Sequence, residues 1–222
     1  MSDDPETLRQ IEELSHDDRP LLVLDVDDVL LDFVKPFPRF LEARGYRLTL
    51  ESFRLFGNVT HSSTGAQLEN EQVTELMDEF FKLQADWQPV TAGAAEALAS
   101  FGGEAEIILL TMMPHRHRDA RRAHLDALGL TFPLLTTEMA KGPAIRRLRG
   151  PSGRPVAFVD DQPRNLASAR ETVHDTHLFH LMADTSIRHM LPDPPEGTHV
   201  VDDWGQAAPL IADVLGISRP AG

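Results

Sequence analysis

The feature that most constrains this chain is an apolar run that ends in closely spaced acidic residues. Residues 20–33 read PLLVLDVDDVLLDF, so an apolar stretch leads directly into Asp25, with Asp27 and Asp28 close behind. A short continuous apolar run is typical of a strand buried on both faces of a parallel sheet. Side chains alternate between the faces of a strand, so Asp25 and Asp27 are expected to point the same way where it ends.

Two neighbouring carboxylates at a buried strand end are unfavourable without a cation, because they repel each other and lose hydration. Mg²⁺ prefers oxygen ligands and usually binds one or two carboxylates, water and a substrate phosphate. The sequence therefore predicts an Mg²⁺ site at this strand end, with a carboxylate available as a nucleophile.

Charge and composition exclude several other classes of function. The 222 residues carry a net charge of −14, which disfavours a nucleic-acid polymer or an anionic membrane as the main partner. No apolar run is long enough to span a bilayer, and the acidic start is unlike a signal peptide. The chain has no cysteine, and we expect a cytoplasmic location.

Apolar and amphipathic segments alternate regularly after residue 89. The predicted strands are 107–110, 132–135, 156–159, 177–182 and 198–201. The predicted helices are 93–101, 115–128, a helix that begins at 141, 163–173 and 206–215. This alternation with short connections predicts an α/β fold with a doubly wound parallel sheet.

A segment of different character, residues 35–88, separates the first strand from this pattern. We predict helices around Phe37–Leu41, from Thr49 to Gly57 and over 67–84, with a polar loop over 58–65. The expected division is therefore an α/β core of residues 18–34 and 89–217 with a small helical cap over 35–88. Residues 1–17 are expected to be a loosely attached N-terminal segment with one short helix.

Further polar residues follow later strands or open a helix, namely Thr111, Lys141 and the pair Asp160 and Asp161. The carboxyl ends of parallel strands meet at one edge, so these residues and Asp25 are expected in one crevice. Asp25, Asp160 and the backbone carbonyl of Asp27 would bind the metal, with Asp161 acting indirectly.

The same residues suggest roles in phosphoryl transfer. Asp25 would attack phosphorus, and Asp27 would protonate the leaving oxygen and later take a proton from water. Thr111, followed by Met112, would hold phosphoryl oxygens, and Lys141 would balance the negative charge.

In their order along the chain, four motifs resemble those of the haloacid dehalogenase-like (HAD) hydrolase superfamily. They are LLVLDVDDV, IILLT, the lysine in AKGPAIRRL, and VAFVDDQPRNL. The resemblance implies a Rossmann-like core with a cap inserted between the first two motifs. It also implies a phosphatase that uses an aspartyl-phosphate and acts on a small phosphorylated metabolite, with a nucleoside monophosphate as first candidate. Asp28, where the family often has Gly, and Met112 with Met113 depart from the usual pattern.

Other functions remain open or fit less well. A catalytically idle HAD scaffold, or a phosphate-binding or regulatory protein, is the main alternative. The motif order disfavours a phospho-accepting signalling receiver, and a dehalogenase would not need Asp27 or a metal pair. A phosphonatase would need a cap lysine, for which Lys82 is the mid-cap candidate. The oligomeric state is not predicted.

Most basic residues outside the motifs are predicted to be structural or solvent-exposed. The histidines at 115, 117, 174, 177 and 180 lack helical metal-pair spacing and are expected on the surface or satisfied in the core. The arginines at 116, 118, 121 and 122 are expected to form a solvated helix face. Residues that could contact a leaving group are Arg39, Arg47, Arg54 and His61, with Phe37 or Phe56 packing against it.

Overall fold

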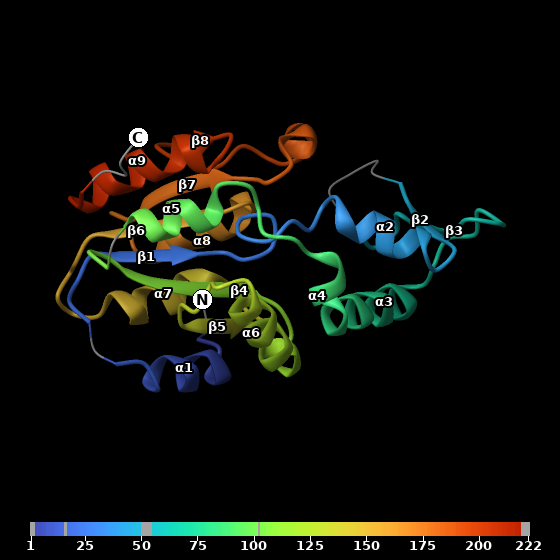
Figure 1. The fold of residues 1–222 in the computed structure, drawn as a ribbon, viewed down its shortest axis with the longest axis horizontal. Helices are drawn as coiled ribbons and strands as arrows, with labels where there is room; N and C mark the ends of the chain where they lie inside the picture. The colour runs from blue at the N-terminus through green and yellow to red at the C-terminus, as the bar shows by residue number, and fades with distance from the viewer. Residues whose placement is uncertain (1–2, 16, 50–54, 102, 219–222) are drawn as a thin grey trace.

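The structure, a computed structural model, describes residues 3–15, 17–49, 55–101 and 103–218. Within these residues, six parallel strands form one sheet in the order β5-β4-β1-β6-β7-β8 (Figure 1). They are β1 (Leu21–Leu24), β4 (Glu106–Met112), β5 (Leu134–Thr137), β6 (Val156–Asp160), β7 (His177–Leu181) and β8 (His199–Val201). The predicted doubly wound parallel sheet is confirmed.

Strand β1 lies inside the sheet because all its side chains are apolar and can be buried on both faces. Its last residue, Leu24, is in register with Leu109 of β4 and Val159 of β6. The chain adds β4 and β5 on one side of β1, then returns to add β6, β7 and β8 on the other. The direction of winding thus reverses between β1 and β6, and ligands of open α/β sheets bind at the carboxyl end of such a switch point.

Helices cover both faces of the sheet, and each face has its own hydrophobic core. Leu22 and Leu24 point into the core that is covered by α5, α6 and α9, whereas Leu21 and Val23 point into the core under α7 and α8. The helices are α5 (Ala94–Ser100), α6 (Arg118–Ala127), α7 (Lys141–Arg149), α8 (Pro163–Thr172) and α9 (Trp204–Leu215), with 3-10 helices η1 (His115–His117) and η2 (Thr185–Met190). The helices predicted after residue 89 are confirmed.

Helix α1 (Pro5–Glu12) packs against α7 and the edge strand β5. Its Thr7 and Gln10 are buried, and both bind Thr136 of β5. Gln10 Oε1 accepts from Thr136 N at 2.9 Å, and Thr7 Oγ1 donates to Thr136 O at 2.7 Å. The prediction of a loosely attached segment was wrong, because its polar side chains bind the open edge of the sheet instead of water.

The insert, residues 35–88, is not purely helical. It contains α2 (Pro36–Glu42), α3 (Asn70–Lys82) and α4 (Gln84–Trp87), but also an antiparallel hairpin of β2 (Tyr46–Leu48) and β3 (Val59–His61). These strands have three residues each, which is too short for alternation to be recognised in the sequence. The predicted helix from Thr49 to Gly57 falls mostly on residues 50–54, which lie outside the described ranges.

Aromatic side chains hold the insert together. Phe80 of α3 packs edge-on against Phe37 and Phe40 of α2, with ring centroids 5.1 Å apart in both pairs. Val73 and Leu76 are buried on the same face of α3, as its hydrophobic period predicts. The insert therefore has its own hydrophobic cluster, separate from the two cores of the sheet.

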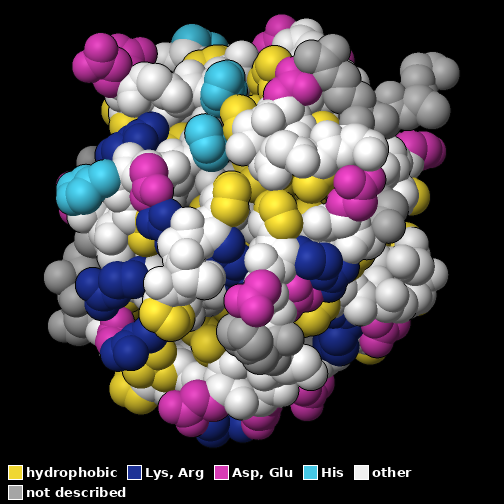
Figure 2. All heavy atoms as spheres, turned by 90° about the vertical axis from the view of Figure 1, so that its left-hand side faces the viewer, with side chains coloured by type: hydrophobic (Ala, Val, Ile, Leu, Met, Phe, Trp, Pro, Cys, Tyr) yellow, Lys and Arg dark blue, Asp and Glu magenta, His cyan; other side chains and the backbone are white. Residues whose placement is uncertain are grey.

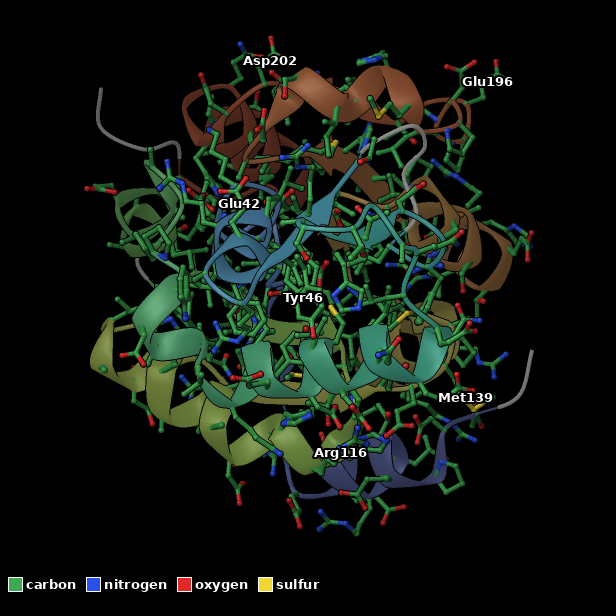
Figure 3. The ribbon with its side chains drawn as sticks, turned by 90° about the vertical axis from the view of Figure 1, so that its right-hand side faces the viewer. Glu42, Tyr46, Arg116, Met139, Glu196 and Asp202 are labelled. Carbon is green, nitrogen blue, oxygen red and sulfur yellow. The ribbon has the colours of Figure 1, made fainter. Side chains whose placement is uncertain are left out.

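In Figure 1, β1 points toward the insert, which lies beyond one end of the sheet. Figure 3 looks onto this side and shows Tyr46 of β2 near the middle of the view, in front of the core. On the opposite face, acidic, basic and hydrophobic side chains are interspersed (Figure 2). In the described ranges, each helix is too short or too polar to cross a bilayer.

The bonds between α1 and β5 predict that Gln10 contributes to stability. Replacing Gln10 by Ala leaves the buried Thr136 N–H without its acceptor, so we expect the free energy of unfolding to fall by about 1–3 kcal/mol. Glu12→Ala, at an exposed position of the same helix, should change it by less than about 0.5 kcal/mol. Urea unfolding of both variants measures the difference, and equal values would show that α1 is not anchored through Gln10.

Candidate active site

The first, third and fourth motifs meet at the carboxyl ends of β1 and β6. Asp25 follows β1, and its backbone N–H donates to Val159 O at 2.9 Å, which places it beside Asp160 at the end of β6. Lys141 opens α7 on the neighbouring side, and its Nζ lies 2.7 Å from both Asp25 Oδ1 and Asp160 Oδ2. All these side chains are buried. Asp25, Lys141 and Asp160 therefore lie together, as the sequence predicts.

The two acidic residues of the fourth motif have different surroundings. Asp160 is already bound on both oxygens, since Oδ1 accepts from Gln162 N at 2.8 Å and Asn165 Nδ2 at 3.0 Å, while Oδ2 faces Lys141. Asp161 lines the adjoining cavity, and within the described chain its carboxylate accepts only from Gln162 Nε2, at 2.5 Å. Asp161 is therefore the more available of the two to a ligand.

Asp25, Asp160 and Asp161 form a carboxylate cluster that fits a divalent cation. One ligand oxygen from each lies within 4.8 Å of the others. Burial raises the pKa of Asp25 to about 7, against the opposing effect of Lys141, and burial raises the pKa of Asp161 well above its usual range. One ammonium faces three carboxylates, so the cluster keeps an excess of negative charge that a metal ion would relieve.

Asp27 has partners that the sequence analysis missed. Arg121 of α6 is fully buried and donates to Asp27 Oδ1 at 2.9 Å and to Oδ2 at 3.3 Å. Gln88, at the end of the insert, donates to the same Oδ1 at 2.8 Å. The prediction that Arg121 is solvated was wrong. The signal for burial was its position one turn before Leu125, on the apolar face of α6.

The other arginines of this segment also have protein partners. Arg118 donates to Leu134 O at 3.1 Å, and Arg122 donates to the backbone carbonyls of Leu130 and Phe132. Arg116 forms an ion pair with Asp78 of α3 and is the exposed member of the set, with 55% of its side chain accessible. The prediction of a solvated face therefore holds for Arg116 alone.

The threonine of the second motif is fully buried and is not among the described residues that line the cavity. Thr111 in β4 is inaccessible, and its Oγ1 has no hydrogen-bond partner within the described part of the chain. Met112, the next residue, lines the cavity. A buried hydroxyl without a partner is costly, so Thr111 is a candidate to bind a ligand oxygen.

Asp28 shapes the link between core and insert. Its φ of 57° lies in the left-handed region that favours glycine. Its Oδ1 accepts from Phe33 N at 2.8 Å and Val34 N at 3.1 Å, the residues that lead into the insert. Burial raises its pKa to about 6. Asp28 thus braces the backbone through Oδ1, while its charge adds to the repulsion that raises the pKa of Asp161.

A cavity of about 400 Å³ lies between the sheet edge and the insert. Asp25, Asp27, Asp28 and Asp161 line it from the core, and Phe37 and Phe56 line it from the insert. Of the polar insert residues predicted to contact a leaving group, Arg39, Arg47 and His61 do not line it, and Arg54 falls outside the described residues.

Several histidines are hydrogen-bonded within the core, as predicted. His115 Nδ1 lies 2.7 Å from Thr136 Oγ1, and His180 Nε2 lies 2.9 Å from the backbone oxygen of Asp161. His117 is buried and lies 2.9 Å from Asp78.

Three solved structures are similar to this chain over almost their whole length. A HAD family hydrolase from Deinococcus radiodurans R1, with bound phosphate and sodium, has a TM-score of 0.60 at 12% identity and covers 92% of this chain and 99% of its own. A predicted phosphoglycolate phosphatase from Haemophilus somnus 129pt has a TM-score of 0.58 at 14% identity. The match covers 89% of this chain and 100% of that structure. A HAD-superfamily hydrolase from Ehrlichia chaffeensis has a TM-score of 0.53 at 15% identity, and the match covers 90% of this chain and 100% of that structure.

This chain has the HAD-type fold. The resemblance seen in its four motifs is thereby confirmed for the fold, and the three motifs that meet at β1, α7 and β6 sit at its switch point. No family model and no curated protein matches the chain, so the HAD-type fold is recognised through structure.

The pairing of Arg121 with Asp27 predicts an effect of Arg121 on stability. Arg121→Met removes a buried cation and leaves Asp27 with Gln88 as its donor, so we expect a loss of about 2–3 kcal/mol in the free energy of unfolding. Arg116→Met, which breaks an exposed ion pair, should cost less than about 1 kcal/mol. Chemical denaturation of both variants makes the comparison. Similar losses would contradict a special role for the buried arginine.

Proposed function

We propose that this protein is an Mg²⁺-dependent phosphomonoester hydrolase that acts through an aspartyl-phosphate on Asp25. The observation that carries the proposal is the position of Lys141 Nζ, 2.7 Å from the carboxylates of both Asp25 and Asp160. This arrangement prepares a buried, oriented carboxylate at the edge of a cavity. The HAD-type fold supports the proposal, since neighbours with this fold are described as phosphatases and one was solved with phosphate bound.

Asp25, Asp161 and the backbone carbonyl of Asp27 would hold the metal ion. We favour Asp161 over Asp160 for direct contact because Asp160 is already bound by Lys141, Asn165 and a backbone N–H. When bound, Mg²⁺ would reduce the repulsion between the carboxylates and an incoming phosphate dianion. Asp160 would act by holding Lys141 in place.

In the first half of the reaction, an Asp25 oxygen forms a bond to phosphorus while the bond from phosphorus to the leaving oxygen breaks. Lys141 keeps Asp25 in position and balances part of the charge on the phosphoryl oxygens. The Thr111 hydroxyl, which has no partner in the described chain, would donate to one of these oxygens.

Asp27 would serve as the acid and the base. It would give a proton to the leaving oxygen, then take one from the water that attacks phosphorus, as the bond between phosphorus and Asp25 breaks and inorganic phosphate leaves. Oδ1 of Asp27 accepts from Arg121 and Gln88, whereas Oδ2 accepts, among the described residues, from Arg121 at 3.3 Å and has room to face the substrate oxygen. Because Gln88 ends the insert, its bond to Oδ1 would couple the orientation of the acid to the position of the insert.

Asp25→Asn is expected to abolish phosphatase activity while preserving the fold. An amide oxygen can still face the Lys141 ammonium, but an amide cannot form the acyl-phosphate, so kcat should fall at least about a thousandfold. Phosphate release from a panel of phosphomonoesters with Mg²⁺ measures the effect, with Asp193→Asn at an exposed position as control. Undiminished turnover by the Asp25→Asn variant would refute the nucleophile assignment.

Metal binding predicts a pH-dependent thermal shift. Because the pKa values of Asp25 and Asp161 are raised, these two groups bind more protons in the folded protein than in the unfolded chain as pH rises from about 4. Without metal, the cluster therefore lowers stability as pH rises through about 4 to 7. At pH 8, Mg²⁺ at ten times its Kd should add about 1.4 kcal/mol, or about 3–6 °C in Tm.

Asp161→Asn provides the matched test of this metal site. It should raise Tm in EDTA at pH 8, because it removes a buried charge, and it should remove most of the shift caused by Mg²⁺. Asp193→Asn should leave both values unchanged. A full Mg²⁺ shift in the Asp161→Asn variant would show that the cation binds elsewhere.

A further inference from the structure

From the lining of the cavity, we infer that the substrate's leaving group is apolar: a phosphate monoester of an aliphatic or aromatic alcohol. This inference rests on the proposed function. It concerns the half of the cavity formed by the insert, away from the carboxylate cluster. Seven described insert side chains supply that half: Phe37, Pro38, Leu48, Leu55, Phe56, Met77 and Phe81.

The polarity of the cavity changes from one side to the other. The acidic residues come from the sheet edge, where the phosphoryl group would bind, and the cation among the described lining residues is Arg164 at the start of α8. On the insert side, every described lining residue is apolar. A substrate that matches the cavity therefore has a charged phosphate end and an apolar end.

The apolar wall remains partly accessible. Phe56 is 50% exposed although it lines the cavity, and Leu48, Leu55 and Met77 are only half-buried. An apolar group placed against these side chains would remove their surface from water, which is favourable in proportion to the area covered. Packing within the insert does not cover this surface, so a ligand can do so.

A hydroxyl-rich leaving group fits the same wall poorly. Sugar hydroxyls would give up hydrogen bonds to water, and the described part of the wall offers no side-chain donor or acceptor in exchange. Arg39, Arg47 and His61 belong to the insert but do not line the cavity. The cavity volume of about 400 Å³ is in the range of small-ligand pockets, so a phosphate with a medium-sized apolar group is a suitable occupant.

The test uses two substrates of equal length, n-hexyl phosphate and 6-hydroxyhexyl phosphate. Their leaving alcohols have nearly the same basicity, so a difference in kcat/KM reports contacts of the distal end. We expect n-hexyl phosphate to be preferred about tenfold or more. Equal rates, or higher kcat/KM for glucose 6-phosphate or a nucleoside 5′-monophosphate, would overturn the inference.

Variants of the wall locate the preference. Met77→Gln and Phe56→Gln add polar groups at partly exposed positions, and each should reduce the hexyl preference several-fold. Met139→Gln is the matched control, since Met139 is also half-buried but lies between β5 and α7, and Figure 3 places it at the periphery of the view. A loss of preference in the control, or none in the wall variants, would contradict the assignment.

Binding separates this inference from the proposed function. Hexylphosphonic acid and 6-hydroxyhexylphosphonic acid cannot be hydrolysed, and calorimetry with Mg²⁺ measures their affinities for the wild type. Tighter binding of the hexyl compound by about tenfold supports the apolar site even if no phosphate is released from any substrate, which would refute the hydrolase alone. Equal affinities refute the apolar site whatever the activity.

Discussion

The ammonium of Lys141 between the carboxylates of Asp25 and Asp160 is the contact on which the rest of the site depends. It joins the end of β1, the start of α7 and the end of β6. Asp25 and Asp160 are more than one hundred residues apart in the sequence. A buried carboxylate is costly unless it is paired, so these three positions must be held together for the sheet edge to fold. One ammonium is not enough for the third carboxylate, that of Asp161, and the remaining negative charge is what suits the site to a cation.

The other acidic residues of the first motif have hydrogen-bond partners of their own. Arg121 and Gln88 bind Asp27, and the backbone N–H groups of Phe33 and Val34 bind Asp28. The acidic residues of one short segment therefore differ in role. Asp25 lies with Lys141 at the edge of the cavity. Asp27 is hydrogen-bonded to α6 and to the end of the insert, and Asp28 fixes the turn that leads into the insert.

The insert forms the apolar side of the cavity. Its aromatic cluster, centred on Phe80, holds α2 and α3 together, and the neighbouring apolar side chains face the cavity. The sheet edge and the insert thus divide recognition between them, with charge on one side and hydrophobic contact on the other. In the proposed function, the core would position a phosphoryl group and the insert would contact the alcohol that carries it.

The sequence by itself determined the parallel α/β core and the set of acidic residues with Lys141, because buried strands and paired carboxylates leave short, local patterns. Tertiary structure decided which polar side chains meet. Arg121 was expected in solvent and Gln10 in a loose segment, and both interpretations failed because the partner lies far away in the chain. The hairpin of β2 and β3 was missed for a local reason, since its strands have only three residues each. The different surroundings of Asp160 and Asp161 could also not be read from the sequence, because Asn165 and Lys141 bind Asp160 only in the folded chain. Sequence periodicity indicates which face of a helix or strand is buried. It does not indicate which buried polar groups pair, because their partners come from elements that pack together only in the folded chain.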